Sequence, residues 1–385
     1  MRSEAGSKAV SKAESKTGLK AVSKAESKAE SKAESKAESK AGSKAAYDHI
    51  PILRYMGNKS RLLDFIIPAI EEVTGYGDTV CDLMAGTHCI GYALKRRRRI
   101  IAGDIQEYSR VIGRAIIENN REAVSAQQAL EELQSSYLEN RRRKMYRFFY
   151  DNYADTYFAP EQCLAIDSIR YAAGRVGDVS RQALYLCALM HTMCKVQSTP
   201  GHFAQFMPKD HPRVLPLREM DVWREFLEKC DDFGNVVDND LMNEVYKVDY
   251  KNLFASLSGD AACFYADPPY SKEQYSRFYH VLETMVKYDL PALKHKALYR
   301  TDRFLSGFCY KDSVEGEFEF IMREVREREA ALVISYSNKG VLPLERLQGL
   351  GAKYFSRCEL RRSSYAHSTL GKGVSSTDEM LLILK

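Results

Sequence analysis

The residues best suited to chemistry follow an apolar segment late in the chain, which ends in Ala266-Asp267-Pro268-Pro269-Tyr270. Two consecutive prolines fix φ and stiffen the turn, so the Asp267 carboxylate and the Pro268 carbonyl can point at one spot. Tyr270 can lie over a flat ring. Such a turn could hold an exocyclic amine on a flat ring, such as the N6 amine of adenine. Two acceptors on its N–H groups would favour a pyramidal nitrogen whose lone pair faces a methyl donor. The competing interpretation is a rigid turn after a buried strand.

A base can reach such a turn only when it is extruded from a duplex, and an aromatic face is typical of sites that hold a flipped base. The competing DNA methylation chemistry, attack at cytosine C5, needs a nucleophilic Cys, which stands in a Pro-Cys dipeptide in those enzymes. None of the eleven prolines is followed by Cys. The pattern therefore favours an exocyclic amine as the methyl acceptor.

A second cluster lies upstream, where residues 79–86 predict a short buried strand that runs into a glycine-containing turn. Residues 90–95 start a helix, residues 99–103 form a second strand that ends at Asp104, and a helix follows over 108–119. In such units the first turn holds a cofactor close to the backbone, and the second acid binds ribose hydroxyls. The alternative is an ordinary turn with a surface Asp.

The charge of this cluster bears on which cofactor fits. The loop lacks the full glycine fingerprint of dinucleotide sites, and a second acid, Asp82, ends the first strand. A carboxylate there suits a cation better than a pyrophosphate. S-adenosyl-L-methionine carries a sulfonium and an ammonium, so it fits better than NAD. We expect this cofactor and no metal.

Together the motifs resemble the DNA adenine-N6 methyltransferases of the Dam class, in which the cofactor loop precedes a target-recognition region and Asp-Pro-Pro-Tyr follows. The resemblance covers residues 50–385. It identifies a catalytic motif of Asp267, Pro268, Pro269 and Tyr270. It also implies a set of cofactor-binding residues, namely Tyr55, Lys59, Asp82, Gly86, Asp104, Asp249 and Tyr250.

The cofactor loop departs from the family's Asp-x-Phe-x-Gly-x-Gly pattern at two positions. Met84 replaces the Phe, which is a tolerable apolar exchange. His88 stands where the second Gly is expected. A side chain there would crowd the cofactor if the backbone must come close or take a positive φ, although His adopts that conformation more readily than most residues.

The resemblance implies an α/β, Rossmann-like S-adenosylmethionine-dependent methyltransferase fold with a mostly parallel seven-stranded sheet and an inserted, mostly helical target-recognition lobe. From its composition we expect a disordered N-terminal repeat tail before this fold. We assign residues 1–46 to the tail, 47–118 to the cofactor-binding half, 119–242 to the helical lobe and 243–385 to the catalytic half. Helices are expected over 122–150, 160–175 and 180–194.

The expected DNA contacts lie mainly outside those helices. Residues 197–213 form a turn-rich loop of aromatics, amides and cations, which can present groups to base edges and phosphates or can simply connect two elements. The DNA-binding candidates are His202, Gln205, Arg213, Arg277 and Asn338. Two basic runs, over 96–99 and 141–144, are where phosphate contacts are expected, although such runs are more often solvated faces.

Net charge separates the tail from the rest of the chain. Residues 1–46 hold eleven basic residues and six Glu, whereas residues 47–385 hold 46 basic and 46 acidic residues. The tail repeats a unit close to Ser-Lys-Ala-Glu and has no apolar stripe, so a solvated leader is the favoured interpretation. A weak, salt-sensitive contact with DNA phosphates is the alternative.

Composition sets further limits. The nine Cys are scattered without a CxxC pair, which argues against metal fingers and disulfide frameworks and favours a reducing cytoplasm, in a bacterial or phage-infected cell. No apolar run reaches the roughly 18 residues of a membrane helix. We expect a monomer that acts on double-stranded DNA in restriction-modification or regulation, with any cognate endonuclease acting separately. The alternatives are an RNA or protein amide methyltransferase and a catalytically inactive DNA-binding relative.

Overall fold

The computed structural model of the chain describes Leu53 and residues 59–257, 259–366 and 376–385, with backbone alone at 364–366 and 376–377. The predictions for the tail over residues 1–46 and for Tyr55 lie outside the described residues. No helix in the described ranges is long and apolar enough to cross a membrane.

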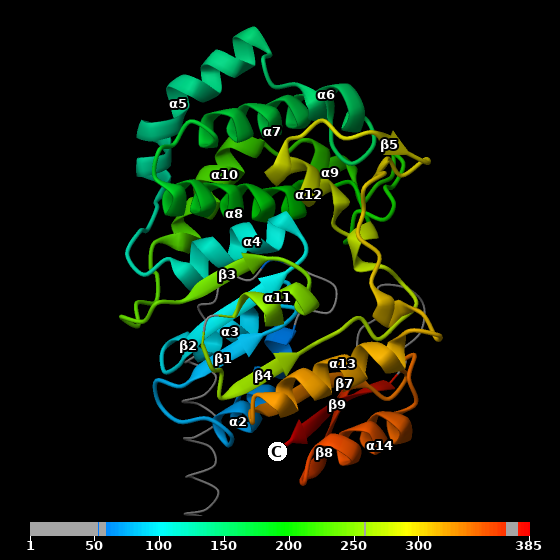
Figure 1. Cartoon of the computed structure of the whole chain (residues 1–385). Helices are drawn as coiled ribbons and strands as arrows, with labels where there is room; N and C mark the ends of the chain where they lie inside the picture. The colour runs from blue at the N-terminus through cyan, green and yellow to red at the C-terminus, as the bar shows by residue number, and fades with distance from the viewer. Residues whose placement is uncertain (1–52, 54–58, 258, 367–375) are drawn as a thin grey trace, which may run out of the picture. The chain divides into compact units, whose positions relative to one another are not determined.

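A seven-stranded sheet organises the described residues, in the order β3-β2-β1-β4-β7-β9-β8 (Figure 1). Its strands are β1 (Thr79–Asp82), β2 (Arg99–Asp104), β3 (Glu244–Lys247), β4 (Cys263–Ala266), β7 (Ala331–Ser337), β8 (Cys358–Ala366) and β9 (Ser376–Leu384). The first five strands in the spatial order run parallel, and β9 pairs antiparallel with both β7 and β8. The prediction of a mostly parallel seven-stranded sheet is confirmed.

The strand order determines where a ligand can bind. The chain passes from β1 to β2 and β3 on one side, and then returns to β4 and β7 on the other side of β1. In open parallel sheets this reversal leaves a crevice at the carboxyl ends of the strands. Asp82 ends β1, Asp104 ends β2, and Asp267 follows β4 directly, so the three acids share this edge.

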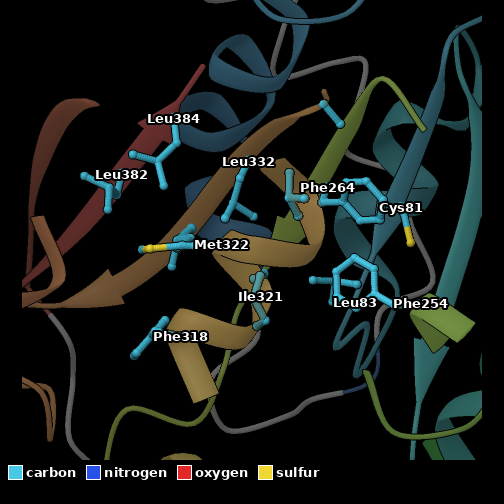
Figure 2. Close-up of a cluster of buried hydrophobic side chains, with 14 of the residues drawn as sticks. Cys81, Leu83, Phe254, Phe264, Phe318, Ile321, Met322, Leu332, Leu382 and Leu384 are labelled. Atoms are coloured by element: carbon cyan, nitrogen blue, oxygen red, sulfur yellow. The ribbon is translucent and has the colours of Figure 1, made fainter. Parts of the chain in front are cut away.

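Helices connect the strands along the chain and pack against the sheet. They include η1 (Lys59–Leu62), α2 (Leu63–Glu71), α3 (Cys89–Lys95), α11 (Tyr250–Ser256), α13 (Val314–Glu327) and α14 (Leu344–Tyr354). In α13 the buried side chains recur every three or four residues, which gives one apolar face. That face, including Phe318 and Met322, lies with Phe264 of β4 and Leu332 of β7 in a buried cluster (Figure 2).

Most of the remaining helices fall between β2 and β3. They are α4 (Glu107–Gly113), a π-helical turn η2 (Arg114–Glu118), α5 (Ala126–Arg143), α6 (Phe148–Tyr153), α7 (Pro160–Ala173), α8 (Val179–Val196), α9 (Leu215–Arg218), α10 (Val222–Cys230) and η3 (Asp231–Phe233). After β4 come η4 (Tyr275–Arg277), α12 (His280–Lys287), β5 (Leu293–Lys294), β6 (Tyr299–Arg300) and η5 (Gly307–Cys309).

The helix expected over 122–150 is two helices, so that prediction was wrong in its continuity. Lys144 has a φ of 54° and ends α5. The Asn140 side chain stabilises the break, because its amide donates to the carbonyl of Tyr146 and its oxygen accepts from the Tyr146 N–H. A polar residue that bonds nearby backbone in this way competes with a continuous helix.

Candidate active site

The carboxyl edge of the sheet opens into a cavity of about 440 Å³, within the size range of small-molecule sites. The cavity wall includes eight of the predicted site residues: Lys59, Asp82, Gly86, Asp104, Asp249, Tyr250, Asp267 and Pro269. They come from five separate segments of the chain. The cofactor loop and the Asp-Pro-Pro-Tyr turn therefore share one cavity.

The glycine turn is built around Gly86, which has a φ of 51°. Its N–H donates to Asp104 Oδ2 at 3.0 Å, and the N–H of Gln106 donates to Oδ1 at 2.8 Å. These bonds fix the acid that ends β2 against the turn after β1. A side chain at position 86 would be strained, because L-residues rarely adopt this backbone conformation.

His88 has a φ of 60°, so the left-handed conformation foreseen at this position is present. Its ring is buried and does not line the cavity. Nε2 lies 2.9 Å from the Ser109 carbonyl, and a Cβ added at Gly113 of α4 would lie only 2.6 Å from the His88 ring. Burial lowers the pKa of His88 to about 4, so the ring is neutral. The imidazole packs against α4, away from the cofactor side, so its side chain does not crowd the cavity.

Negative charge dominates the cofactor half of the cavity. Five acids line it (Asp82, Asp104, Asp249, Asp267 and Glu317), together with two lysines (Lys59 and Lys251). Burial, followed by the charge of Asp267, raises the pKa of Asp82 to about 8. Burial also raises the pKa of Asp104. No cation is among the groups that shift the pKa of Asp82, so this wall fits a sulfonium and an ammonium better than it fits a pyrophosphate.

Asp249 and Tyr250 line the same cavity from the start of α11. Asp249 is the N-cap of this helix and accepts from the N–H of Asn252 at 2.9 Å. The Tyr250 hydroxyl donates to Glu317, and its ring lies 5.5 Å from that of Phe308. These contacts hold a flat aromatic surface in the wall.

The predicted catalytic turn, residues 267–270, is held by the ammonium of Lys59. Its Nζ lies 3.0 Å from Asp267 Oδ1 and donates to the Tyr270 hydroxyl at 3.2 Å. The resemblance placed Lys59 among the cofactor-binding residues. In the structure the side chain does line the cavity, but its charge is engaged by the turn. Burial alone would lower the pKa of Lys59, but Asp267, Tyr270 and Glu379 raise it well above its ordinary value.

Asp267 and Tyr270 have well-defined surroundings. Burial raises the pKa of Asp267 to about 6, although the Lys59 charge acts in the opposite direction. The Tyr270 ring lies edge-on to Tyr336, 6.2 Å away between centroids, and the Tyr270 carbonyl accepts from the N–H of Val341. Pro268 is buried beside them. The turn is thus rigid and carries an acid that can be ionised near neutral pH.

A further wall was not foreseen in the sequence. The Gln274 side chain exchanges two hydrogen bonds with the backbone of Ser306, and the Ser276 hydroxyl donates to the Phe304 carbonyl at 2.8 Å. These bonds fasten the segment after the catalytic turn to residues 304–308, which line the cavity. The contacts join segments about thirty residues apart, and no periodic pattern marks them in the sequence.

The DNA-binding candidates fall into two groups. The segment that contains His202 contacts the segment that contains Arg277. The ring centroids of His202 and Phe278 lie 5.1 Å apart, and the N–H of Phe203 donates to the Phe278 carbonyl at 2.8 Å. Gln205 is exposed on the same loop. The loop over residues 197–207 is therefore attached to the segment that follows the catalytic turn.

Arg213 and Asn338 lie apart from that contact. Arg213 is exposed beyond the loop. Asn338 bonds Asp378 of β9 through both its backbone and its side chain, and it does not line the cavity.

The basic runs are largely engaged in internal contacts. Arg98 is buried and donates to Thr74, and Arg99 pairs with Glu244. Both lie at the beginning of β2, the edge opposite the cavity. In the second run, Arg141 pairs with Glu161 and Arg143 with Glu139. The first run is thus poorly suited to contact a substrate in the cavity.

One buried carboxylate near the catalytic turn was missed. Glu379 of β9 is fully buried, and its Oε1 lies 3.0 Å from Lys59 Nζ. The only sequence signal was an acid directly before the apolar run Met380–Leu384. Within the described ranges, no group of three or more His, Cys, Asp or Glu side chains is arranged to hold a metal ion.

Comparison with known proteins agrees with this arrangement. Residues 55–322 match the family described as D12 class N6 adenine-specific DNA methyltransferase. The modification methylase LlaI of Lactococcus lactis subsp. lactis is 30% identical over 316 residues, which are 78% of this chain and 49% of that protein. The type II methyltransferase M.FokI of Planomicrobium okeanokoites is 28% identical over 323 residues, 77% of this chain and 46% of that protein.

A third relative has a more similar length. The type II methyltransferase M.NlaIII of Neisseria lactamica is 26% identical over 350 residues, which cover 86% of this chain and 99% of that protein. The chain thus spans about half the length of the first two relatives and nearly all of the third.

Proposed function

We propose that this chain, which belongs to the D12 class N6 adenine-specific DNA methyltransferase family, methylates the N6 amine of an adenine flipped out of duplex DNA at a specific site. The observation that carries the proposal is the single cavity that connects the acids of the cofactor loop with Asp267. A methyl donor and an amine can meet there without leaving the protein.

The cofactor half of the cavity suits S-adenosyl-L-methionine, which supplies an electrophilic methyl group. Asp82 would face its cationic groups, because this acid is buried without a cation of its own. Asp104 and the backbone around Gly86 would hold the ribose. Asp249 and Tyr250 would border the adenine of the cofactor, and Lys59 would lie at the cofactor's other end. Tyr55 is proposed as a cofactor-binding residue from the resemblance alone.

The catalytic half positions the amine. Asp267 and the Pro268 carbonyl accept its N–H bonds, Pro269 stiffens the turn, and Tyr270 lies against the flipped base. The nitrogen loses one proton as it gains the methyl group. Asp267, whose pKa is about 6, can hold that proton.

Target recognition would involve the helices over residues 119–242 and the loop over 197–213. The attachment of Phe203 to Phe278 supports this proposal, because a loop that contacts DNA would then be coupled to the catalytic turn. His202, Gln205 and Arg277 are the preferred contacts, with Arg213 further out. Asn338 is a weaker candidate, because Asp378 occupies its side chain.

We further propose a monomer that acts in the cytoplasm as a modification methylase, with any cognate endonuclease a separate protein. The similarity to LlaI, M.FokI and M.NlaIII supports restriction-modification. In this proposal residues 47–118 and 243–385 form the catalytic domain, and residues 1–46 are a solvated leader.

The experiment is to incubate the full chain and labelled S-adenosyl-L-methionine with duplex DNA, with RNA or with protein, in three separate reactions. Label should appear in DNA, on adenine N6. Asp267→Ala should abolish transfer, a loss of at least about a thousandfold, because the variant removes the carboxylate that positions the amine and takes its proton. Cofactor affinity should stay within a few-fold, because the proposed cofactor-binding residues are unchanged.

Asp260→Ala is a suitable control, because this exposed acid precedes β4 at the opposite end of the strand. It should retain full activity. Label in RNA or protein alone would refute the choice of substrate. DNA binding by the wild-type chain without any transfer would indicate a catalytically inactive relative. Long-read sequencing of DNA from cells that express the chain would then identify the methylated site.

A further inference from the structure

Glu379 is a buried charged residue close to the catalytic turn that the reaction as proposed above does not use. It lies on β9, which pairs with β7, and its side chain is 1% exposed. A buried carboxylate is costly unless it is paired and hydrogen-bonded. Glu379 Oε1 meets that requirement twice, through Lys59 Nζ at 3.0 Å and through the Ser335 hydroxyl at 2.7 Å.

The same ammonium also serves the catalytic turn. Lys59 Nζ lies 3.0 Å from Asp267 Oδ1 and 3.0 Å from Glu379 Oε1, and it donates to the Tyr270 hydroxyl. Two carboxylates therefore share one cation, and the Lys59 side chain that carries it is only 4% exposed. Each of them limits how strongly the other can be neutralised by Lys59.

This sharing affects what Asp267 can do. An Asp267 that is fully paired with Lys59 would offer its oxygens to the ammonium and would be a poorer acceptor for a neutral amine. Glu379 attracts the Lys59 ammonium away from Asp267, and the hydrogen bond from Ser335 fixes the position of the Glu379 carboxylate. Asp267 keeps an oxygen for the amine as a result.

We propose that Glu379 is a positioning residue for methyl transfer, which holds Lys59 between two carboxylates and thereby keeps Asp267 basic and available to the amine. This inference rests on the proposed function. Glu379 acts only through Lys59, since it lines neither the cavity nor the catalytic turn.

Asp267 has other charged or titratable neighbours, which any pH experiment must hold constant. They are Lys59, Asp82, Cys89, Tyr265, Tyr270, Tyr275 and Glu379. In the free protein the Glu379 charge raises the pKa of Asp267, whereas Lys59 lowers it. Saturating cofactor would hold constant the state of Asp82, whose pKa is raised to about 8 in the free protein by burial and by the charge of Asp267.

The test is Glu379→Gln, which keeps the shape and an acceptor for Ser335 but removes the charge. Single-turnover methylation of duplex DNA at saturating cofactor should fall roughly ten- to a hundredfold. The acid limb of its pH profile should move down by about one pH unit, because Asp267 loses a like charge. The KM for the cofactor should change little. Glu359→Gln, on the neighbouring strand β8, is the matched control and should leave the rate and the profile unchanged.

A second readout does not depend on activity. The carboxyl carbon resonance of Asp267, assigned as the one lost in Asp267→Asn, should titrate at lower pH in Glu379→Gln than in the wild-type chain. An unmoved titration would overturn the inference even if the rate falls. An inactive wild-type chain would refute the proposed function, whereas this titration would still decide the role of Glu379.

Ser335→Ala covers the case in which Glu379→Gln does not fold. It frees the Glu379 carboxylate from its anchor while keeping the charge. We expect a several-fold lower rate with an unmoved acid limb. A rate equal to that of the wild-type chain would contradict the positioning role.

Discussion

Asp82 shows how a single residue can trade stability for binding. Its side chain is buried at the end of β1, and the Met84 N–H is a distant donor at 3.4 Å. Burial raises its pKa to about 8, far above the ordinary value of an Asp. Between about pH 4 and pH 8 the folded, cofactor-free protein therefore binds one more proton at Asp82 than the unfolded chain does. This carboxyl makes the free protein less stable as the pH rises through that window.

Asp82→Asn should therefore stabilise the free protein and weaken cofactor binding. The melting temperature of the variant should exceed that of the wild-type chain, and the difference should grow from about pH 5 to pH 8. Affinity for S-adenosyl-L-methionine should fall at least about tenfold, because the variant loses the charge that faces the cofactor's cations. Thermal unfolding and calorimetric titration measure the two effects.

Proton release gives a sharper test of the same residue. At pH 7 the wild-type Asp82 must lose a proton to meet a cation, so binding should release close to one proton, measurable in buffers of different ionisation enthalpy. The variant should release correspondingly less, and comparing the two removes the contribution of the cofactor's own ammonium. Equal proton release in both proteins would contradict the assignment of Asp82.

At the level of elements, the sequence predicted those parts whose pattern is local. The strands predicted within 79–86, over 99–103 and before Asp267 are short apolar runs that end at or next to an acid. The structure has them as β1, β2 and β4. The break in the helix over 122–150 depends on Asn140 bonding Tyr146, which no periodicity reveals. The role of Glu379 depends on β9 lying next to β7, a contact between distant segments that one sequence does not encode locally.

The connection between the cofactor loop and α3 allows a direct test of His88. Because its ring packs on α4 and away from the cavity, His88→Gly should leave cofactor affinity within about threefold. It should lower the free energy of unfolding by about 1–3 kcal/mol, because a buried ring is lost. Part of the loss is offset, because Gly tolerates the positive φ at this position better than His does. Chemical denaturation and calorimetric titration measure both quantities.

Gly113→Ala is the complementary change in α4. Its Cβ would lie 2.6 Å from both the His88 ring and a Val245 methyl, so it should also destabilise the protein.

A large gain in cofactor affinity in His88→Gly would show instead that the imidazole hinders the cofactor.

For the whole molecule, net charge and the position of the site are separate matters. Residues 47–385 carry equal numbers of basic and acidic residues, and many arginines in the described ranges are paired with acids of their own segment or its neighbours. Under the proposed function, residues 47–385 would bind DNA through a local group of cations near the cavity rather than through their overall field. The excess charge of the chain belongs to residues 1–46.

Removing residues 2–46 tests whether that excess takes part in binding. If the tail is a solvated leader, the shortened chain should methylate the same DNA sites at the same single-turnover rate. The slope of log affinity against log salt should also stay the same, because that slope counts the phosphates that the protein neutralises. Filter binding or fluorescence anisotropy over about 0.05–0.3 M salt measures the slope. A slope reduced by several units would show that the Lys repeat contacts DNA phosphates and that the tail contributes affinity.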